Sequence, residues 1–146
     1  MTMSYWDTSS LAKLFLVEPD SAIFDELANR SAPIRISPLV RYEARLTFLR
    51  REREGAIASH AAVVLSRRLD QDIGVGKMEL IAADFAIETE FEQVVQACMN
   101  RATSIWIRTL DALHLAAALS VRETEFVSND IRQRAAAVAL GMTVLP

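Results

Sequence analysis

The sequence predicts a single α/β domain over residues 1–146, with a mostly parallel central sheet of about five strands flanked by helices. Short apolar runs of strand length alternate along the chain with longer segments of helical period. Strands that are separated by helices pair in parallel through right-handed crossovers. A chain of 146 residues that is 51% hydrophobic can bury roughly two thirds of its unfolded surface, so one core is expected.

Each expected element follows from a local pattern. The strands are expected at 3–6, 34–37, 78–81, 125–128 and 143–145. The helices are expected from about Ser9, with Ser9 or Ser10 as N-cap, then after 19–21 and at 38–54, 59–72, 84–101, 109–121 and 131–140. Ser37 and Pro38 form an N-cap and first-turn pair, while Gly55 and Gly141 each follow the end of a helical pattern.

Charge and composition narrow the class of protein. The net charge of −3 argues against a general nucleic-acid binder, but the basic residues are unevenly distributed. Only Lys13 and Lys77 of the 16 basic residues are lysines, and seven of the arginines cluster at positions 41, 45, 50, 51, 53, 67 and 68. This cluster is either a solvated helix face interleaved with Glu52 and Glu54 or a rim that binds phosphate.

Several protein classes are disfavoured by what the sequence lacks. No uncharged apolar run of roughly 18 residues occurs and the first seven residues do not resemble a signal peptide, so a cytoplasmic protein without a membrane partner is expected. The single Cys98 rules out an intrachain disulfide and a CxxC metal site. Its apolar helical surroundings indicate a core residue.

Four acidic residues stand in apolar or strand-end surroundings: Asp7, Glu43, Asp111 and Asp130. Asp7 and Asp130 each follow a predicted strand, and the carboxyl ends of parallel strands border one crevice. Glu43 falls in the second turn of the helix expected at 38–54 and Asp111 in the first turn of the helix expected at 109–121, so both could face the same crevice. Carboxylate oxygens suit Mg²⁺ or Mn²⁺, so the set indicates a metal site. The alternative for each acid alone is a helix cap or a partner of the helix dipole.

Four segments resemble the signatures of PIN domains, and most closely those of VapC-type toxins. They are YWDTSSLAKL at 5–14, the helix that carries Glu43, RTLDALHLA at 108–116 and VSND at 127–130. Together they cover nearly the whole chain in order. The resemblance implies a PIN-like three-layer fold and a Mg²⁺- or Mn²⁺-dependent endoribonuclease, which is held inactive by a cognate antitoxin.

The resemblance also implies roles for single residues. It makes Asp7, Glu43, Asp111 and Asp130 the catalytic and metal-binding acids, and it makes Ser9 and Ser128 the hydroxyls that support them. The family often has threonine at the position of Ser128, and serine retains the hydroxyl group. A homodimer and a groove for an antitoxin peptide are further implications, and the substrate is expected to be single-stranded or looped RNA.

Other side chains near these motifs keep two interpretations each. Lys13 and Arg108 either contact substrate phosphate or are solvated. His114 is expected to be a hydrogen-bonded core residue rather than a ligand or base. Core packing is also favoured over base stacking for Trp6 and Trp106. The early helices carry several large apolar residues, which have two interpretations. Either one face of the sheet cannot bury them all and some contact a partner, or all belong to the core; they are Leu14, Phe15, Leu16, Phe24 and Leu27.

Two other functions remain alternatives. A catalytically inactive PIN-like domain would act only as a protein-binding module, although the presence of all four acids gives no reason to expect loss of metal. An aspartate-nucleophile phosphatase or receiver-like domain would use Asp7 as nucleophile, but a second acid immediately beside Asp7 is missing. A test of divalent-metal binding would distinguish the binding module from a nuclease. A test for covalent phosphorylation would distinguish the phosphatase or receiver-like domain.

Overall fold

The computed structural model describes the backbone of residues 2–146 and all of their side chains except that of residue 32. The strands are β1 (Thr2–Trp6), β2 (Ser31–Ile36), β3 (Met78–Leu80), β4 (Glu125–Val127) and β5 (Thr143–Leu145). The helices are α1 (Thr8–Ala12), α2 (Ser21–Arg30), α3 (Pro38–Arg53), α4 (Ala61–Gly74), α5 (Phe85–Met99), α6 (Thr109–Ser120) and α7 (Ile131–Ala139). The predicted α/β architecture is confirmed.

The strands form one sheet in the order β3-β2-β1-β4-β5, and every neighbouring pair is parallel. The first strand, β1, therefore lies in the middle, where Tyr5 is in register with Arg35 of β2 and Phe126 of β4. The chain crosses from one half of the sheet to the other between β3 and β4. This change of direction places the ends of β1 and β4 side by side at the centre.

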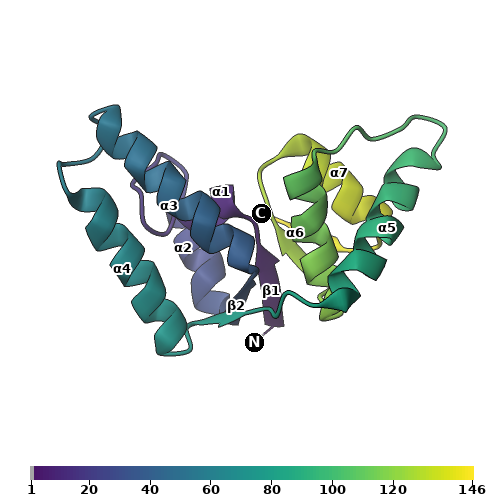
Figure 1. The fold of residues 1–146 in the computed structure, drawn as a ribbon, viewed down its shortest axis with the longest axis horizontal. Helices are drawn as coiled ribbons and strands as arrows, with labels where there is room; N and C mark the ends of the chain where they lie inside the picture. Colours follow the sequence, from purple (N-terminus) through teal and green to yellow (C-terminus); the bar gives the residue numbers. More distant parts are fainter. Residues whose placement is uncertain (1) are drawn as a thin grey trace.

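Two apolar cores form because successive side chains of a strand point to opposite faces of the sheet. Trp6 and Val127 belong to the core beneath α1–α4, whereas their neighbours Tyr5 and Phe126 belong to the core beneath α5–α7. Figure 1 shows these two groups of helices on opposite sides of the strands. The three-layer arrangement expected from the sequence is thus present.

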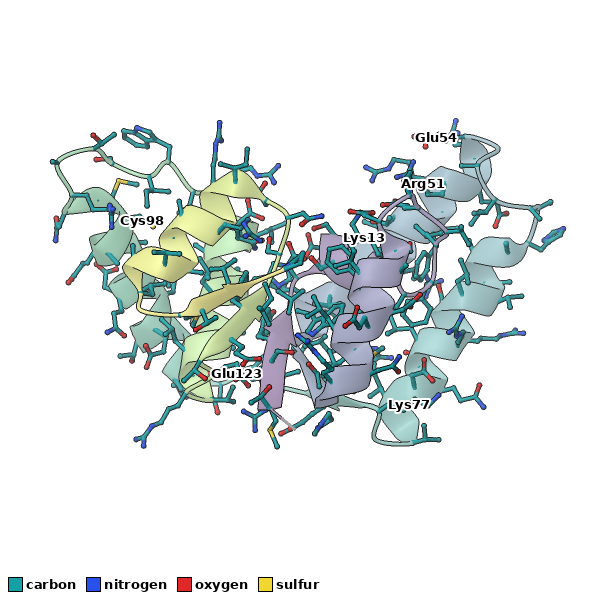
Figure 2. All side chains as sticks on the ribbon, turned by 180° about the vertical axis from the view of Figure 1, so that it is seen from behind. Lys13, Arg51, Glu54, Lys77, Cys98 and Glu123 are labelled. Carbon is teal, nitrogen blue, oxygen red and sulfur yellow. The ribbon has the colours of Figure 1, made fainter. Side chains whose placement is uncertain are left out.

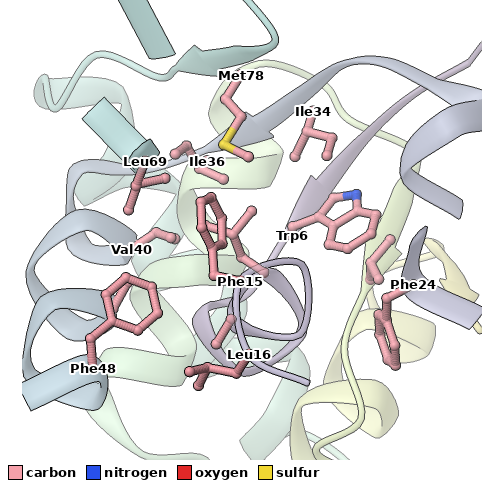
Figure 3. Packing of buried hydrophobic residues seen from close by; sticks show 14 of the residues in the cluster. Trp6, Phe15, Leu16, Phe24, Ile34, Ile36, Val40, Phe48, Leu69 and Met78 are labelled. Carbon is pink, nitrogen blue, oxygen red and sulfur yellow. The ribbon is translucent and has the colours of Figure 1, made fainter. Parts of the chain in front are cut away.

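The core on the α1–α4 side contains most of the large aromatic side chains. Figure 3 shows Phe15 and Phe48 among aliphatic residues of β2, α3 and α4, with Trp6 and Phe24 on the far side of the cluster. The rings of Phe15 and Phe48 are 5.8 Å apart, centroid to centroid, and those of Trp6 and Phe24 are 6.0 Å apart. This packing fixes α1 and α3 over the sheet.

The apolar residues of the early helices belong to this core. Phe15, Leu16, Phe24 and Leu27 are all buried, and Leu14 packs against the cluster. The structure therefore contradicts the idea that they exceed what one sheet face can bury. The large apolar side chains that do reach the surface on this side include Tyr42, Leu46 and Leu49 of α3. Among residues 2–146, no helix has both the length and the apolar character needed to cross a membrane.

Two boundaries differ from the predictions in an informative way. The first helix begins at Thr8 and is capped by Asp7, not by Ser9 or Ser10, because the Asp7 carboxylate accepts a hydrogen bond from the backbone N–H of Ser10 at 2.8 Å. Strand β2 begins three residues before the apolar run that predicted it. Its first residue, Ser31, is in register with Thr2, and its hydroxyl lies 2.8 Å from that of Ser4.

Candidate functional site

A cavity of about 800 Å³ opens at the carboxyl ends of the central strands, and all four predicted acids line it. Asp7 comes from the end of β1, Glu43 from α3, Asp111 from α6 and Asp130 from the start of α7. The predicted supporting residue Ser9 and the predicted substrate contacts Lys13 and Arg108 line the same cavity. The sheet therefore brings together residues that are up to 123 positions apart in the sequence.

Asp7 is the most buried and most fully hydrogen-bonded of the four acids. Its side chain belongs to a residue only 3% exposed, and Oδ1 accepts the backbone N–H of Ser10. Oδ2 accepts hydrogen bonds from the hydroxyls of Ser9 at 2.9 Å and Ser128 at 2.7 Å. Three donors fix this carboxylate in one orientation, and they offset part of the cost of burying its charge.

Glu43 is held by a hydrogen-bonded chain that starts on the other face of the sheet. Its Oε1 accepts the hydroxyl of Thr8 at 2.9 Å and lies 2.6 Å from Nε2 of His114. Burial raises the pKa of Glu43, but the His114 hydrogen bond and charge, the Thr8 hydrogen bond and the Arg108 charge outweigh burial and set that pKa below its ordinary value. The carboxylate is therefore ionised at neutral pH.

Asp111 and Arg108 form an ion pair within the first turn of α6. Arg108 Nε lies 2.8 Å from Asp111 Oδ2. The Asp111 side chain is 16% exposed and that of Arg108 is 71% exposed, so this pair sits at the open side of the cavity. Its hydrogen bond and charge raise the pKa of the Arg108 guanidinium, which remains a permanent cation. Arg108 is thus placed against an acid.

Asp130 is the N-cap of α7, since its Oδ1 accepts the backbone N–H of Gln133 at 2.9 Å. Asp130 and Asp7 are therefore both helix caps, which was the alternative interpretation of each acid. It does not exclude a second role, because both residues also line the acidic cavity. The buried hydroxyl of Ser128 connects them: it accepts the backbone N–H of Asp130 at 3.1 Å while it donates toward Asp7.

The donor set fits a hard divalent cation. Among the described residues, no hydrogen bond is made to Oε2 of Glu43, Oδ1 of Asp111 or Oδ2 of Asp130, so each of these acids keeps one oxygen for a ligand. The positions of the side chains are a separate matter. Within residues 2–146, no three His, Cys, Asp or Glu side chains stand close enough to enclose a metal. Arg108 on Asp111 and His114 on Glu43 already occupy one oxygen of each acid.

The basic residues around the cavity differ in whether an acid neutralises them. Lys13 lies 2.7 Å from both Glu18 and Asp20, and its side chain is only 12% exposed. Figure 2 shows Lys13 and Arg51 on the α1–α4 side of the molecule, and Arg51 also pairs with Glu18, at 3.2 Å.

Arg50 also lines the cavity, and it has no acidic partner within the part of the chain described. It is exposed at the C-terminal end of α3. A guanidinium that pairs with no acid can bind a phosphate without first breaking an ion pair. The arginine cluster seen in the sequence is thus divided by the fold: Arg41 pairs with Asp70 at 2.7 Å, whereas Arg50 faces the site.

The structure settles the residues for which two interpretations stood open. Trp6 is fully buried and Cys98 is a buried free cysteine, as predicted. His114 is 2% exposed and hydrogen-bonded, as predicted for a core residue, yet it also lines the cavity. The prediction for Trp106 was wrong, since this side chain is 73% exposed in the loop before α6. Its apolar neighbours in the sequence favoured core packing, but the side chain reaches the solvent from this loop.

Sequence reasoning missed three residues that the fold adds to the site: Thr8, Gln133 and Arg50. Thr8 is an ordinary helix-start residue, and nothing in its spacing marks its contact with Glu43. Arg50 stood within the noted cluster, but only the α3 orientation separates it from its neighbours. A signal for Gln133 did exist, because Asp130 precedes it by three residues, the spacing of an N-cap and the N–H that it accepts.

Comparisons with known proteins agree on the fold. The family model described as PIN domain matches residues 4–139. A structure of VapBC2 from Rickettsia felis bound to a promoter DNA fragment matches with a TM-score of 0.67 and 16% identity, covering 99% of this chain and 98% of that one. FitAcB from Neisseria gonorrhoeae matches with a TM-score of 0.71 and 17% identity, covering 99% and 97%.

A third solved structure is named for an activity. VapC20 from Mycobacterium tuberculosis, described as a sarcin-ricin loop cleaving toxin, matches with a TM-score of 0.60 and 20% identity, covering 91% of this chain and 94% of that one. No curated protein sequence matches this chain significantly. At these identities the solved structures establish a shared fold.

Proposed function

This chain belongs to the PIN domain family, and from that premise we propose that it is a Mg²⁺- or Mn²⁺-dependent endoribonuclease that acts as the toxin of a toxin-antitoxin pair. The observation that carries the proposal is the convergence of four carboxylates, from four separate elements, on one cavity. No three of these four described side chains stand close enough together to enclose a metal in the present arrangement. Because like charges that line one cavity repel each other, a cation bound between them would offset that repulsion.

The proposed metal ligands are Asp7, Asp111 and Asp130, with Glu43 as a further ligand or as the residue that orients the attacking water. Bound in such a site, a divalent cation lowers the pKa of a water molecule and stabilises negative charge on a phosphate. The oxygens that accept no hydrogen bond on Glu43, Asp111 and Asp130 support this assignment. Asp7 differs, because three hydrogen bonds hold its carboxylate in one orientation. It would therefore bind a metal without changing its rotamer.

The chain's own residues supply orientation and substrate contacts. Ser9 and Ser128 keep the Asp7 carboxylate in place through their hydroxyls. Arg50, with no acidic partner among the described residues, is the cation best placed to bind a substrate phosphate beside the acids. Arg108 would reach phosphate only after leaving Asp111, and Lys13 only after leaving Glu18 and Asp20. Lys13 is therefore a weaker candidate than the sequence suggested.

The proposed substrate is looped or single-stranded RNA. A phosphodiester in a duplex is held in a regular helix, whereas a loop can present one phosphate to an open cavity. VapC20, which shares the fold, is described as cleaving a loop, and this supports the same class of substrate here. The proposed partners are a cognate antitoxin and a second copy of the chain. The VapBC2 structure in its DNA-bound form supports an arrangement in which such a toxin works in a larger assembly.

The test is cleavage of a total RNA pool by the purified chain, freed of any copurifying partner, with Mg²⁺ or Mn²⁺ and with a chelator. Asp7→Asn should abolish cutting while it keeps the fold, because an amide oxygen can still accept the Ser10 N–H that caps α1. The matched control is Asp70→Asn, which changes an exposed acid of α4 outside the cavity. Substantial activity in Asp7→Asn would sink the assignment.

A different result would favour the protein-binding module. If the folded wild-type chain binds no divalent cation and cuts no RNA, the ion pair of Arg108 with Asp111 would be the resting state of an inactive site. Calorimetric titration with Mn²⁺ makes this distinction directly.

A further inference from the structure

A buried hydrogen-bonded chain reaches Glu43 from the opposite core of the protein. The Tyr5 hydroxyl of β1 lies 2.7 Å from Nδ1 of His114, and Nε2 of His114 lies 2.6 Å from Oε1 of Glu43. Tyr5 is 0% exposed and His114 is 2% exposed. Both ring nitrogens of the histidine therefore have one partner each, in a region that water does not reach.

The chemistry of the carboxylate fixes the direction of the hydrogen bond between His114 and Glu43. An ionised carboxylate can only accept, so the proton between His114 and Glu43 is carried by Nε2. The other nitrogen, Nδ1, lies 2.7 Å from the Tyr5 hydroxyl, which can donate to a neutral imidazole or accept from a protonated one. Burial raises the pKa of that phenol well above its ordinary value, which keeps the hydroxyl available as a donor.

We propose that Tyr5 and His114 are positioning residues for Glu43: the phenol fixes the imidazole, and the imidazole holds one carboxylate oxygen so that the other is presented to the cavity. The Glu43 side chain extends from α3 and is 31% exposed, so packing alone does not enclose it. Thr8 and His114 both bind Oε1, whereas Oε2 accepts no hydrogen bond from a described residue. Oε1 is therefore the oxygen held by the protein, and Oε2 is the oxygen left to bind a ligand.

This arrangement joins the two helical layers across the end of the sheet. Glu43 belongs to α3 on one face, and His114 belongs to α6 on the other. Partners that hold a ligand in orientation typically change metal affinity or activity about 10- to 100-fold when removed. The inference rests on the proposed function for the role of Glu43, but the hydrogen bonds themselves can be tested without RNA.

The first test is nitrogen NMR of the histidine rings, which is favourable because the chain has only two histidines. His60 lies outside the cavity, and His60→Gln assigns the remaining signals to His114. The expected result is a protonated Nε2 that is coupled to Glu43, and loss of that signal pattern in Glu43→Leu, which has no acceptor. An unprotonated Nε2 in the wild-type chain would overturn the proposal.

The second test compares variants that differ in one hydrogen bond. His114→Leu keeps most of the buried volume but removes the donor to Glu43, and it should lower kcat and Mn²⁺ affinity about 10- to 100-fold with little change in KM. His114→Gln, whose amide can still donate to Glu43, should recover most of both losses. Tyr5→Phe removes only the hydroxyl and should give a smaller loss in the same two quantities.

A structural control separates positioning from general damage. Val94→Ala removes buried volume from the same core as Tyr5 and His114 without touching the chain of hydrogen bonds. It should lower the free energy of unfolding but leave Mn²⁺ affinity unchanged. Equal losses of Mn²⁺ affinity in Val94→Ala and His114→Leu would overturn the proposal, as would a failure of His114→Gln to recover it. Mn²⁺ binding without RNA cleavage by the wild type would contradict the nuclease alone.

Discussion

Asp7 serves two purposes that a single substitution can separate. Its Oδ1 caps α1, and its Oδ2 gathers the hydroxyls of Ser9 and Ser128 at the edge of the cavity. A carboxylate is well suited to both, because it has several acceptor sites on two oxygens. The cost of its burial is borne by the same donors that give it a fixed orientation. Activity and stability at this residue therefore depend on different atoms.

Asp7→Ala should be less stable than Asp7→Asn by about 1–2 kcal/mol, because alanine removes the cap of α1 whereas asparagine keeps an acceptor. Both variants should be inactive. Urea unfolding followed by circular dichroism gives the difference in free energy. Equal stability of the two variants would show that the cap contributes nothing.

Arg50→Gln should raise KM for RNA and reduce the dependence of log affinity on log salt by about 0.7, the value for one phosphate contact to a single strand. kcat should change little, since Arg50 is proposed to bind and not to react. Binding of an uncleavable RNA by an Asp7→Asn background, at several salt concentrations, measures this slope. Arg53→Gln is the control, because Arg53 is on the same helix but does not line the acidic cavity. An equal change in both variants would assign the effect to net charge.

At the scale of elements, strands and helices were predictable wherever an apolar period met a clear stop. The helix at 38–54 begins at Pro38 and ends at Arg53, and the last two strands lie within a residue of their predicted ranges. The prediction failed where a tertiary contact decided the boundary, as for Ser31 in β2 and for the cap of α1. The positions of the acids were predictable from topology. The hydrogen bond of His114 to Glu43 was not, because it depends on where the fold places α3 and α6, two helices on opposite faces of the sheet.

Replacing glycine by alanine should change stability in opposite directions at two helix ends. Gly141 follows α7 with a φ of +82°, a backbone conformation that side chains disfavour, so Gly141→Ala should destabilise the protein by about 1 kcal/mol. Gly74 is the last residue of α4, has no such φ and has open space where a Cβ would lie. Gly74→Ala should stabilise by about 0.4–1 kcal/mol. Thermal unfolding of both variants checks the signs, and two shifts in the same direction would contradict this explanation.

At the scale of the whole molecule, the site depends on both helical layers and on the middle of the sheet. Asp7 and Asp130 extend from β1 and β4, while Glu43 and Asp111 come from helices on opposite faces. On the proposed function, metal binding and global stability should therefore be coupled, because the unfolded chain does not bring these acids together. A cation that binds the folded state stabilises it by mass action.

Mn²⁺ at about 100 times its dissociation constant should add about 2.7 kcal/mol to the free energy of unfolding of the wild-type chain. The same addition should have much less effect on Asp7→Asn, and a chelator should reverse the gain. Differential scanning calorimetry at several Mn²⁺ concentrations measures this. A gain of equal size in the variant would place the bound cation elsewhere on the protein.

The strand order has a consequence for synthesis in the cell. The first strand, β1, can pair with β2 early, but its other neighbour, β4, is made only when residues 125–127 have been added. During synthesis, the edge of β1 that pairs with β4 therefore stays unpaired until β4 has left the ribosome. Asp130 follows β4, so the set of four acids is complete only after residue 130 has been added. On the proposed function, a nascent chain should therefore be unable to cleave RNA before residue 130 has been added and the sheet has closed around β1.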